Sequence, residues 1–390
     1  MTHYNLAVIG GGINGVAIAC DAALRGLKVL LVEKNTIGSG TSSKTSKLAH
    51  GGLRYLEQFE LGLVRESLYE RNLLLKNAPT YVKPLPFIIP IYQDSQWHPL
   101  MLKIGLSLYD FLSGKKDLST HKTLKKKEIL HKVPGLKSDT LKTGFRYYDA
   151  QMDDIGIIKS LATLSKRHGV TILENTLVTD LVYKDHQAIG LNVQTKEGKM
   201  SVMADKIIQA TGPWTNQLQK KDDPSAEPVV LATKGVHIVL PGLPVQDALL
   251  LSTPQDHRVF FIIPWQGKTL IGTTDTAYHG NPDTLIVSSQ DREYLLTAYN
   301  TYFPEDTRTS EDILEAFVGL RPLLNMPAGK STSQKSRDYK ILESPSGLLT
   351  IAGGKFTTHR AMAEAAVDQI CESLGPKKWK ACQTKTIKLP

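Results

Sequence analysis

Cysteine and long apolar runs are both scarce in this chain of 390 residues. Its three cysteines, Cys20, Cys371 and Cys382, form no Cys-x-x-Cys pair, so they fit neither a disulfide framework nor a zinc site and favour a reducing cytoplasm. The histidines show no metal-ligand spacing either, and we expect no metal. The longest apolar run, Val259 to Trp265, is far shorter than the ~20 residues that span a bilayer. Residues 1–4 are too few for a signal peptide, so we expect a soluble or peripheral protein.

Acidic residues are outnumbered by basic ones. The chain has 47 Lys and Arg against 38 Asp and Glu, a formal net charge of +9, which favours anionic partners such as a phosphorylated substrate, acidic lipid or nucleic acid. Part of the excess lies between Lys115 and Lys132, where seven lysines stand against Asp117 and Glu128. This segment lacks interleaved aromatics and any nucleic-acid-binding signature, so we expect no nucleic-acid partner. It is either a solvated face or a patch that binds an anionic membrane surface.

The first 33 residues alternate apolar runs with glycines. In order they are a strand at Leu6–Ile9, the motif Gly10-x-Gly12-x-x-Gly15, a helix at Val16–Arg25 and a strand at Lys28–Val32 that ends in Glu33. The glycines allow a tight turn, close approach of the backbone to a pyrophosphate, and packing of helix on strand. The helix N-terminus offers N–H groups to phosphates, and Glu33 would accept hydrogen bonds from the adenosine ribose, which argues against NADP. The pattern predicts a bound dinucleotide.

Three features favour FAD over NAD as that dinucleotide. The motif lies at the extreme N-terminus. The apolar strand Lys206–Ala210 ends in Thr211-Gly212, like the second signature of the two-dinucleotide-binding flavoproteins, and a third glycine-rich strand–helix junction stands at Gly353-Gly354. No second Gly-x-Gly-x-x-Gly occurs, so the chain carries no separate NAD(P)H module. Electrons must therefore enter from a substrate and leave to another acceptor.

Further along the chain, the pattern predicts an interrupted nucleotide domain. Helices are expected at Met101–Leu112, Asp154–His168, Gln290–Tyr302 and Thr357–Leu374, and strands at Thr171–Leu173, Leu177–Tyr183, Ala188–Gln194, Gly235–Leu240, Arg258–Pro264, Leu270–Thr274 and Leu348–Ala352. The expected fold class is α/β: a Rossmann-type FAD-binding domain with an inserted, mostly antiparallel β-sheet substrate domain. We place the discontinuous FAD-binding domain at residues 1–80, 146–225 and 341–390, and the substrate-binding domain at residues 81–145 and 226–340.

A series of motifs spans the whole chain. They are Gly40-Thr-Ser-Ser-Lys-Thr-Ser-Lys-Leu-Ala-His-Gly-Gly-Leu-Arg-Tyr-Leu56, Ala210-Thr-Gly-Pro-Trp214, Lys234-Gly-Val-His-Ile-Val239, Ile263-Pro-Trp265, Gly272-Thr-Thr-Asp275, Gly319-Leu-Arg-Pro-Leu323, Arg337-Asp-Tyr339 and Gly353-Gly-Lys-Phe-Thr-Thr358. Through them the chain resembles the FAD-dependent glycerol-3-phosphate dehydrogenases, whose FAD-binding domain is of the glutathione-reductase and D-amino-acid-oxidase type. Two departures stand out. His359 replaces the usual Tyr, which would alter a contact behind the flavin, and the chain stops at Pro390, where many bacterial members continue into a C-terminal helical domain.

This resemblance implies a reaction and its partners. The secondary carbon of sn-glycerol 3-phosphate would be oxidised, giving dihydroxyacetone phosphate, with hydride passing to flavin N5. The reduced flavin would pass its electrons to a quinone at the membrane, or to oxygen as in oxidase relatives. The motif at Gly353-Gly354-Lys355 offers no cysteine or histidine where related oxidases attach the flavin through a cysteine, so we expect non-covalent FAD.

Cations within these motifs supply the predicted substrate site. A phosphate dianion needs charge-assisted donors, which we expect from Arg54, Arg321, Arg337 and Lys355, with Tyr55 bonding a substrate oxygen. The carbinol also needs a proton acceptor as hydride leaves, and an imidazole titrates near working pH. We predict His237 as this base and Arg321 as the second catalytic residue. A packed core position remains the alternative for His237.

The residues expected to hold FAD come from the same motifs. Around the phosphates and ribose they are Gly10, Gly12, Ile13, Asn14, Gly15, Glu33 and Lys34. From the serine-rich loop they are Thr41, Ser42, Ser43, Ser46, Lys47, Leu48 and His50, where the serines have a helix N-cap cluster as their alternative. The others are Val178, Ala210, Thr211, Gly212, Gly354, Lys355, Phe356, Thr357 and Thr358.

A quinone is lipid-soluble, so an enzyme without a spanning helix must dock on the bilayer to meet it. The apolar helix at Met101–Leu112, next to the lysines of residues 115–132, favours a cytoplasmic protein that is peripheral on the inner face of the cytoplasmic membrane. Two alternatives stay open. One is a flavin oxidase of similar fold acting on glycerol 3-phosphate with oxygen, or on a 2-hydroxy or amino acid. The other is a non-catalytic flavoprotein that binds lipid or a partner.

Overall fold

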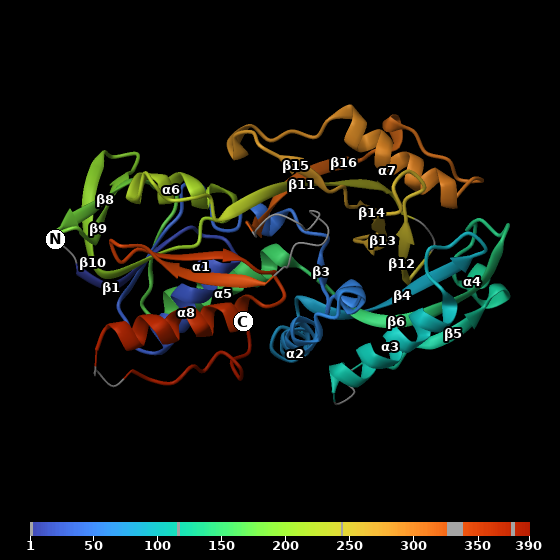
Figure 1. Cartoon of the computed structure of the whole chain (residues 1–390), viewed down its shortest axis with the longest axis horizontal. Helices are drawn as coiled ribbons and strands as arrows, with labels where there is room; N and C mark the ends of the chain where they lie inside the picture. Colours follow the sequence, from blue (N-terminus) through green and yellow to red (C-terminus); the bar gives the residue numbers. More distant parts are fainter. Residues whose placement is uncertain (1–2, 115–117, 243–244, 326–337, 376–378) are drawn as a thin grey trace.

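The computed structural model describes residues 3–114, 118–242, 245–325, 338–375 and 379–390. Two β-sheets lie beside each other, and helices pack on both (Figure 1). The sheet that contains the N-terminal strand lies on the left of that view, and the second sheet lies on the right. No helix in these ranges is both long enough and apolar enough to cross a bilayer.

The first sheet has the strand order β17-β18-β10-β1-β2-β7, with the hairpin β8–β9 attached to β10. Its strands are β1 (His3–Ile9), β2 (Val29–Val32), β7 (Thr171–Leu173), β8 (Leu177–Lys184), β9 (Gln187–Gln194), β10 (Lys199–Gln209), β17 (Tyr339–Glu343) and β18 (Leu349–Gly353). The five central strands β18, β10, β1, β2 and β7 run parallel. The predicted parallel sheet and the predicted hairpin are confirmed.

Helices α1 (Ile13–Leu24), α5 (Asp154–Arg167) and α8 (His359–Ser373) form one apolar core with the first sheet. The opposite face of this sheet packs against the hairpin and α6 (Thr215–Asp222). Both faces are therefore covered, which explains why β1 and β2 read as uninterrupted apolar runs. Helix α1 begins three residues earlier than its apolar pattern suggested, directly after Gly12.

The second sheet has the order β15-β11-β14-β13-β12-β4-β6-β3, with β16 paired to β11 and β5 to β6. Its strands are β3 (Leu48–Ala49), β4 (Val82–Tyr92), β5 (Lys122–Lys125), β6 (Leu141–Met152), β11 (Val230–Pro241), β12 (Ala248–Ser252), β13 (Val259–Trp265), β14 (Lys268–Gly272), β15 (Thr276–Tyr278) and β16 (Glu315–Leu324). The pairing is antiparallel except between β12 and β4, as expected of the substrate sheet. The domain boundaries given above stay a prediction.

Two layers of helix pack on the second sheet. Helices α4 (Lys126–Lys132) and α7 (Ser289–Tyr302) share one core with it, and α2 (Leu61–Asn77) and α3 (Pro99–Ser113) share another. Short 3-10 turns complete the described chain: η1 (Thr41–Ser43), η2 (Leu53–Gln58), η3 (Gly212–Trp214), η4 (Pro282–Thr284) and η5 (Ser310–Asp312). The predicted helices near 101–112, 154–168, 290–302 and 357–374 are confirmed, with ends shifted by a few residues.

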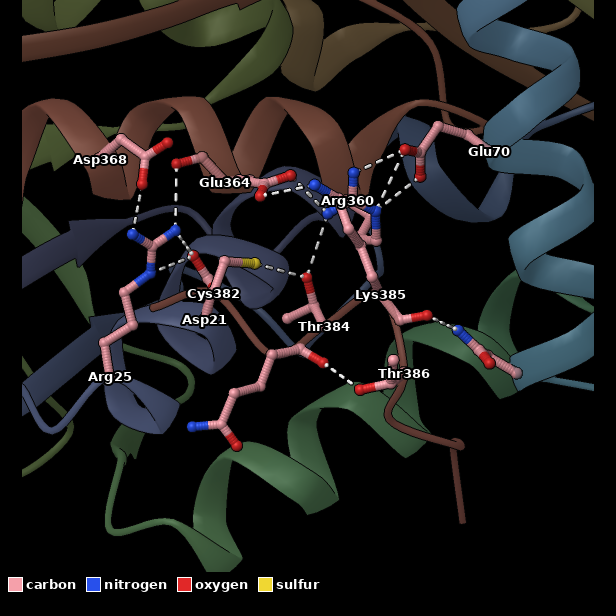
Figure 2. Close-up of polar contacts among 12 residues, drawn as sticks. Asp21, Arg25, Glu70, Arg360, Glu364, Asp368, Cys382, Thr384, Lys385 and Thr386 are labelled. Atoms are coloured by element: carbon pink, nitrogen blue, oxygen red, sulfur yellow. Dashed lines mark hydrogen bonds and ion pairs between the residues drawn. The ribbon is translucent and has the colours of Figure 1, made fainter. Parts of the chain in front are cut away.

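Ion pairs join α8 to α1 and α2 (Figure 2). Arg25, which caps the C-terminus of α1, contacts Asp21 at 2.6 Å and also contacts Asp368 on α8. Arg360 on α8 lies between Glu70 on α2, at 2.6 Å, and Glu364, at 2.8 Å. Because Glu70 and Arg25 are almost fully buried, losing one partner would leave an uncompensated charge in the interior. These contacts fix the helix that follows the last strand of the first sheet.

Candidate active site

A cavity of about 560 Å³ lies where the two sheets meet. The carboxyl ends of β1, β2 and β10 line one end of it, and strands β11 and β16 of the second sheet line the other. In open parallel sheets, ligands bind outside the carboxyl ends of the strands. The glycine motif and the predicted substrate residues therefore face the same space.

Two positions of the motif after β1, Gly10 and Gly15, admit only glycine. Gly10 has φ +106°, and a Cβ there would stand 2.6 Å from the carbonyl oxygen of Ala210. A Cβ on Gly15 would collide with the carbonyl of Gly10. Gly12 and Asn14 line the cavity, and the buried Oδ1 of Asn14 has no hydrogen-bond partner among the described residues. A glycine cradle with an unpaired polar atom aimed at it fits the predicted dinucleotide.

Glu33 lies at the tip of β2, as the motif predicted. Its carboxylate accepts hydrogen bonds from the backbone N–H of Gly11 at 2.6 Å and of Asn35 at 2.9 Å. A carboxylate accepts about four hydrogen bonds, so capacity remains for ribose hydroxyls. The neighbouring Lys34 pairs with Asp283 at 2.5 Å and lies 3.9 Å from the centre of the Trp214 ring.

The serine-rich loop is tied mainly to the protein itself. Thr41 donates to the carbonyl of Leu320 at 2.8 Å, and Ser42 accepts from the N–H of Ile13 at the start of α1 at 3.0 Å. Ser43 donates to backbone carbonyls of its own turn. Ser46 differs, because its Oγ lies 2.8 Å from Nε2 of His237, a residue 191 positions away.

His237 lies on β11 with only 3% of its surface exposed. Its ring stacks on Phe317 of β16, and Gly272 of β14 stands directly opposite. Burial, together with the positive charges of Arg321 and Lys47, lowers the pKa of His237 to about 3. The imidazole is therefore neutral at ordinary pH, which is the state that a proton acceptor requires.

Two of the predicted cations face the cavity. Arg321 on β16 donates to Asp275 at 3.2 Å and to the hydroxyl of Thr273 at 2.7 Å. Lys355 donates to Ser67 at 3.0 Å and lies 3.9 Å from the centre of the Tyr55 ring. Neither cation is fully enclosed by its protein partners, so both can contribute to binding an anion.

The cavity brings together most of the residues that the motifs suggested. Those on its lining are Gly10, Gly12, Ile13, Asn14, Glu33, Lys34, Thr41, Ser42, Ser46, Leu48, His50, Val178, Ala210, Thr211, Gly212, His237, Arg321, Gly354, Lys355, Phe356 and Thr357. Predicted residues that lie off this lining in the described chain are Gly15, Ser43, Lys47, Arg54, Tyr55 and Thr358. Arg337 lies outside the described residues. The role of each remains a prediction.

Some residues of the second sheet that line the cavity were not among those predicted from the motifs. Gly235 on β11 stands opposite Gly319 on β16, and a Cβ on either would strike the side chain of Arg321 or Lys44. A glycine inside a strand often marks such a close approach, so this signal was present in the sequence. Trp214 and Lys221, which also line the cavity, were missed too.

His359 does not line the main cavity in the described chain, and its predicted contact behind the flavin stays a prediction. The His359 side chain is buried beside a second, small cavity that Glu70 and Arg360 also line, and its Nδ1 lies 2.8 Å from the carbonyl of Phe356. Burial lowers the pKa of His359 to about 4, so it is neutral at ordinary pH. Among the described residues, no group of three or more His, Cys, Asp or Glu side chains is arranged to hold a metal ion.

Comparison with known proteins points to one group of enzymes. Residues 5–369 match a family model described as FAD dependent oxidoreductase. The chain is 39% identical over 392 residues to the aerobic glycerol-3-phosphate dehydrogenase of Bacillus subtilis (strain 168), covering 98% of this chain and 70% of that protein. It is 38% identical over 391 residues to the enzyme of the same name from Staphylococcus haemolyticus (strain JCSC1435), with the same coverage.

Solved structures agree with this match. The glycerol-3-phosphate dehydrogenase from Bacillus halodurans complexed with FAD superposes with a TM-score of 0.81 at 31% identity, covering 100% of this chain and 68% of that one. An L-alpha-glycerophosphate oxidase from Mycoplasma pneumoniae superposes with a TM-score of 0.74 at 18% identity, covering 95% of each chain. At that identity the likeness shows the fold alone.

Proposed function

The chain belongs to the FAD-dependent oxidoreductases, and within them to the aerobic glycerol-3-phosphate dehydrogenases, and on this premise we propose that it oxidises sn-glycerol 3-phosphate to dihydroxyacetone phosphate with a quinone as the final acceptor. The observation that carries the proposal is the meeting of three groups on one cavity: the glycine cradle, a buried neutral histidine, and two cations. This combination suits removal of hydride and proton from an alcohol that bears a phosphate.

The cofactor supplies the hydride acceptor when it is bound, and the chain supplies everything else. Gly10, Gly12 and the start of α1, which line the cavity, would present backbone to its pyrophosphate, and Glu33 would accept hydrogen bonds from its ribose. Arg321 and Lys355 hold the substrate phosphate through charge-assisted hydrogen bonds. Because the phosphate is a dianion, its arrival offsets the charge of Arg321 that lowers the pKa of His237, and so strengthens the base.

His237 accepts the proton of the secondary hydroxyl as hydride leaves the carbon. Nε2 is the ring atom that we assign to this step: it takes the proton of the Ser46 hydroxyl, which lines the cavity and in turn takes the proton of the substrate hydroxyl. Phe317 on one side of the ring and Gly272 opposite it restrict its movement. A base held in one orientation keeps the reacting atoms aligned, which accounts for a large part of the rate in such reactions.

We further propose that the enzyme docks on an anionic membrane, where it meets the quinone. Helix α3 buries Leu106 and Tyr109 on one face, so part of it packs inward, but its other face exposes Leu100, Met101, Ile104 and Phe111. Exposed apolar residues Phe59 and Leu61, beside η2, add to this surface.

The basic element of the proposed docking surface is exposed as well. Lys125, Lys126 and Lys127, at the junction of β5 and α4, all face solvent. The start of β5 lies against α3, because the backbone N–H of His121 donates to Asp110 of α3 at 3.0 Å, whereas α4 packs on the other face of the second sheet. An apolar face next to a basic patch binds lipid interfaces, with each lysine adding about 1 kcal/mol near an anionic surface.

Anaerobic titration of the flavin tests the proposed reaction. We expect one equivalent of sn-glycerol 3-phosphate to bleach the yellow absorbance, whereas glycerol and 2-hydroxy or amino acids leave it unchanged. Bleaching by one of those acids and not by the phosphate would overturn the proposal in favour of an oxidase of similar fold. Air reoxidation of the reduced flavin then separates the two classes of acceptor, because it is fast in an oxidase.

A further inference from the structure

A buried carboxylate anchors the loop that carries Ser46. Asp154, at the start of α5, has only 1% of its surface exposed. Its two carboxylate oxygens each accept from Nζ of Lys47 at 2.8 Å, and Oδ2 also accepts from the hydroxyl of Thr45 at 2.6 Å. Asp154 therefore holds the residue before Ser46 and the residue after it.

The other end of this loop is anchored in the same way. β3 pairs with the end of β6, so that Leu48 lies opposite Gln151. Beyond it, the N–H of Gly51 donates to Asp149 at 3.1 Å, and Asp149 is 2% exposed. The segment from β6 to α5 thus contacts residues 45–51 at both ends, and the hydroxyl of Ser46, between Thr45 and Lys47, contacts His237.

Charged groups from two elements act on His237. Lys47 comes from the loop and Arg321 from β16, and both charges lower the pKa of the imidazole. Each cation has its own carboxylate, Asp154 for Lys47 and Asp275 for Arg321. Asp154 consequently affects His237 in two ways, since it fixes the position of Ser46 and balances the charge of Lys47.

We propose that Asp154 is a positioning residue of the reaction: by binding Thr45 and Lys47 it holds the Ser46 hydroxyl against Nε2 of His237 and fixes the orientation of the imidazole. This inference deepens the proposed function and rests on His237 acting as the base. Asp154 does not line the cavity in the described chain, so its effect on the reaction must pass through the loop.

A double-mutant cycle tests the route from Asp154 through Ser46. We expect Asp154→Asn and Ser46→Ala each to slow anaerobic flavin reduction by about 10- to 100-fold, the cost of misplacing a catalytic group, with a much smaller change in KM. In the Ser46→Ala background, Asp154→Asn should slow the reaction much less than it does in the wild type, because only the unbalanced charge of Lys47 then acts on His237. The inference would be overturned if the rate losses of the two single variants multiplied in the double variant. It would also be overturned if the Asp154→Asn protein reduced its flavin at the wild-type rate.

Two further variants separate positioning from general destabilisation. Thr45→Val removes one hydrogen bond to Asp154 without changing any charge, and we expect it to slow the reaction in the same way but less. This variant provides the test if the Asp154→Asn protein does not fold. The matched control is Asp291→Asn, which breaks a comparable ion pair to Lys234 on the strand that carries His237. That control should lower thermal stability and leave the flavin reduction rate unchanged. A rate loss in Asp291→Asn equal to that in Asp154→Asn would contradict a specific role.

A spectroscopic readout makes the test independent of the substrate. In protein with ¹⁵N-labelled histidine, the ring nitrogen signals of His237 are the ones missing from the spectrum of the His237→Asn variant. We expect the wild type to show two well-separated ring nitrogen shifts, as for one fixed tautomer, and Asp154→Asn to show averaged shifts. Unchanged shifts in Asp154→Asn would overturn the inference. If glycerol 3-phosphate fails to reduce the wild-type flavin, the proposed function fails while this measurement still decides the role of Asp154.

Discussion

Replacing Gly272 with alanine tests whether the position of His237 governs the reaction. Gly272 on β14 stands directly opposite His237 on β11. A Cβ at residue 272 would lie 2.8 Å from Cγ and 2.9 Å from Nε2 of the imidazole, and closer still to Cδ2. Nonbonded carbon atoms prefer separations of about 3.5–4.0 Å, so the ring must move by roughly 1 Å. Such a movement disturbs both its stacking on Phe317 and its contact with Ser46.

Moving a catalytic group by about 1 Å costs roughly a hundredfold in rate. We therefore expect Gly272→Ala to slow anaerobic flavin reduction by about that factor while the protein keeps its FAD and its affinity for substrate. Stopped-flow absorbance at saturating glycerol 3-phosphate measures the rate, and the visible spectrum measures the FAD content. Gly62→Ala on α2 is the control, since a Cβ there meets nothing within 4 Å. A Gly272→Ala enzyme that reduces its flavin at the wild-type rate refutes the reasoning.

Four other predictions follow from the site and its surroundings. Lys355→Met should raise the KM for glycerol 3-phosphate about ten- to a hundredfold, since a charged hydrogen bond contributes roughly 1.5–3 kcal/mol, while the protein stays yellow; an unchanged KM removes Lys355 from the site. His359 has a folded pKa near 4, below its usual 6.5, so the unfolded chain takes up its proton first and stability falls as pH drops from 6.5 toward 4. Between pH 7 and pH 5 the unfolding free energy of the wild type should therefore fall by about 2 kcal/mol more than that of His359→Gln in urea titrations, and equal slopes would contradict this. The protein should sediment with anionic liposomes at low salt and stay in solution at 1 M salt. If the variant with Lys125→Glu, Lys126→Glu and Lys127→Glu together still sediments, these lysines do not bind the membrane. Acid precipitation should release all of the yellow colour into the supernatant, whereas colour in the pellet would mean a covalent flavin.

The nucleotide half of the fold could be predicted because its signals are local. β1, the glycine turn, α1 and β2 follow one another within 33 residues, and the predictions of FAD and of the family are confirmed by the comparisons. Helix α2 was not foreseen, because its inward face buries polar side chains, among them Glu70 and Arg71, in place of a simple apolar stripe. Strand β4 was missed because it carries Pro84, Pro86 and Pro90. These prolines lie at alternate positions, so their missing N–H groups fall on one side of the strand.

The candidate site also contains some residues whose positions could be predicted from the sequence and others whose positions could not. Glu33 and the glycines lie where the motif puts them, because sequence spacing alone fixes their geometry. The contact of Ser46 with His237 joins residues 191 positions apart, and the anchoring of Lys47 by Asp154 joins residues 107 apart. The motif predicts that Ser46 and Lys47 contact the cofactor, but it does not show which side chains of the protein they also contact. Their partners depend on how the two sheets meet, which no local pattern records.

Transfer of hydride from the secondary carbon of glycerol 3-phosphate is the central claim, and isotopic substitution tests it most directly. The anaerobic rate of flavin reduction is measured with substrate deuterated at C2, and with substrate deuterated at C1 as the comparison. Deuterium at C2 should slow the reduction through a primary isotope effect, and deuterium at C1 should leave the rate unchanged. A flavin that glycerol 3-phosphate does not reduce, or one whose reduction slows with deuterium at C1 and not at C2, would contradict the account.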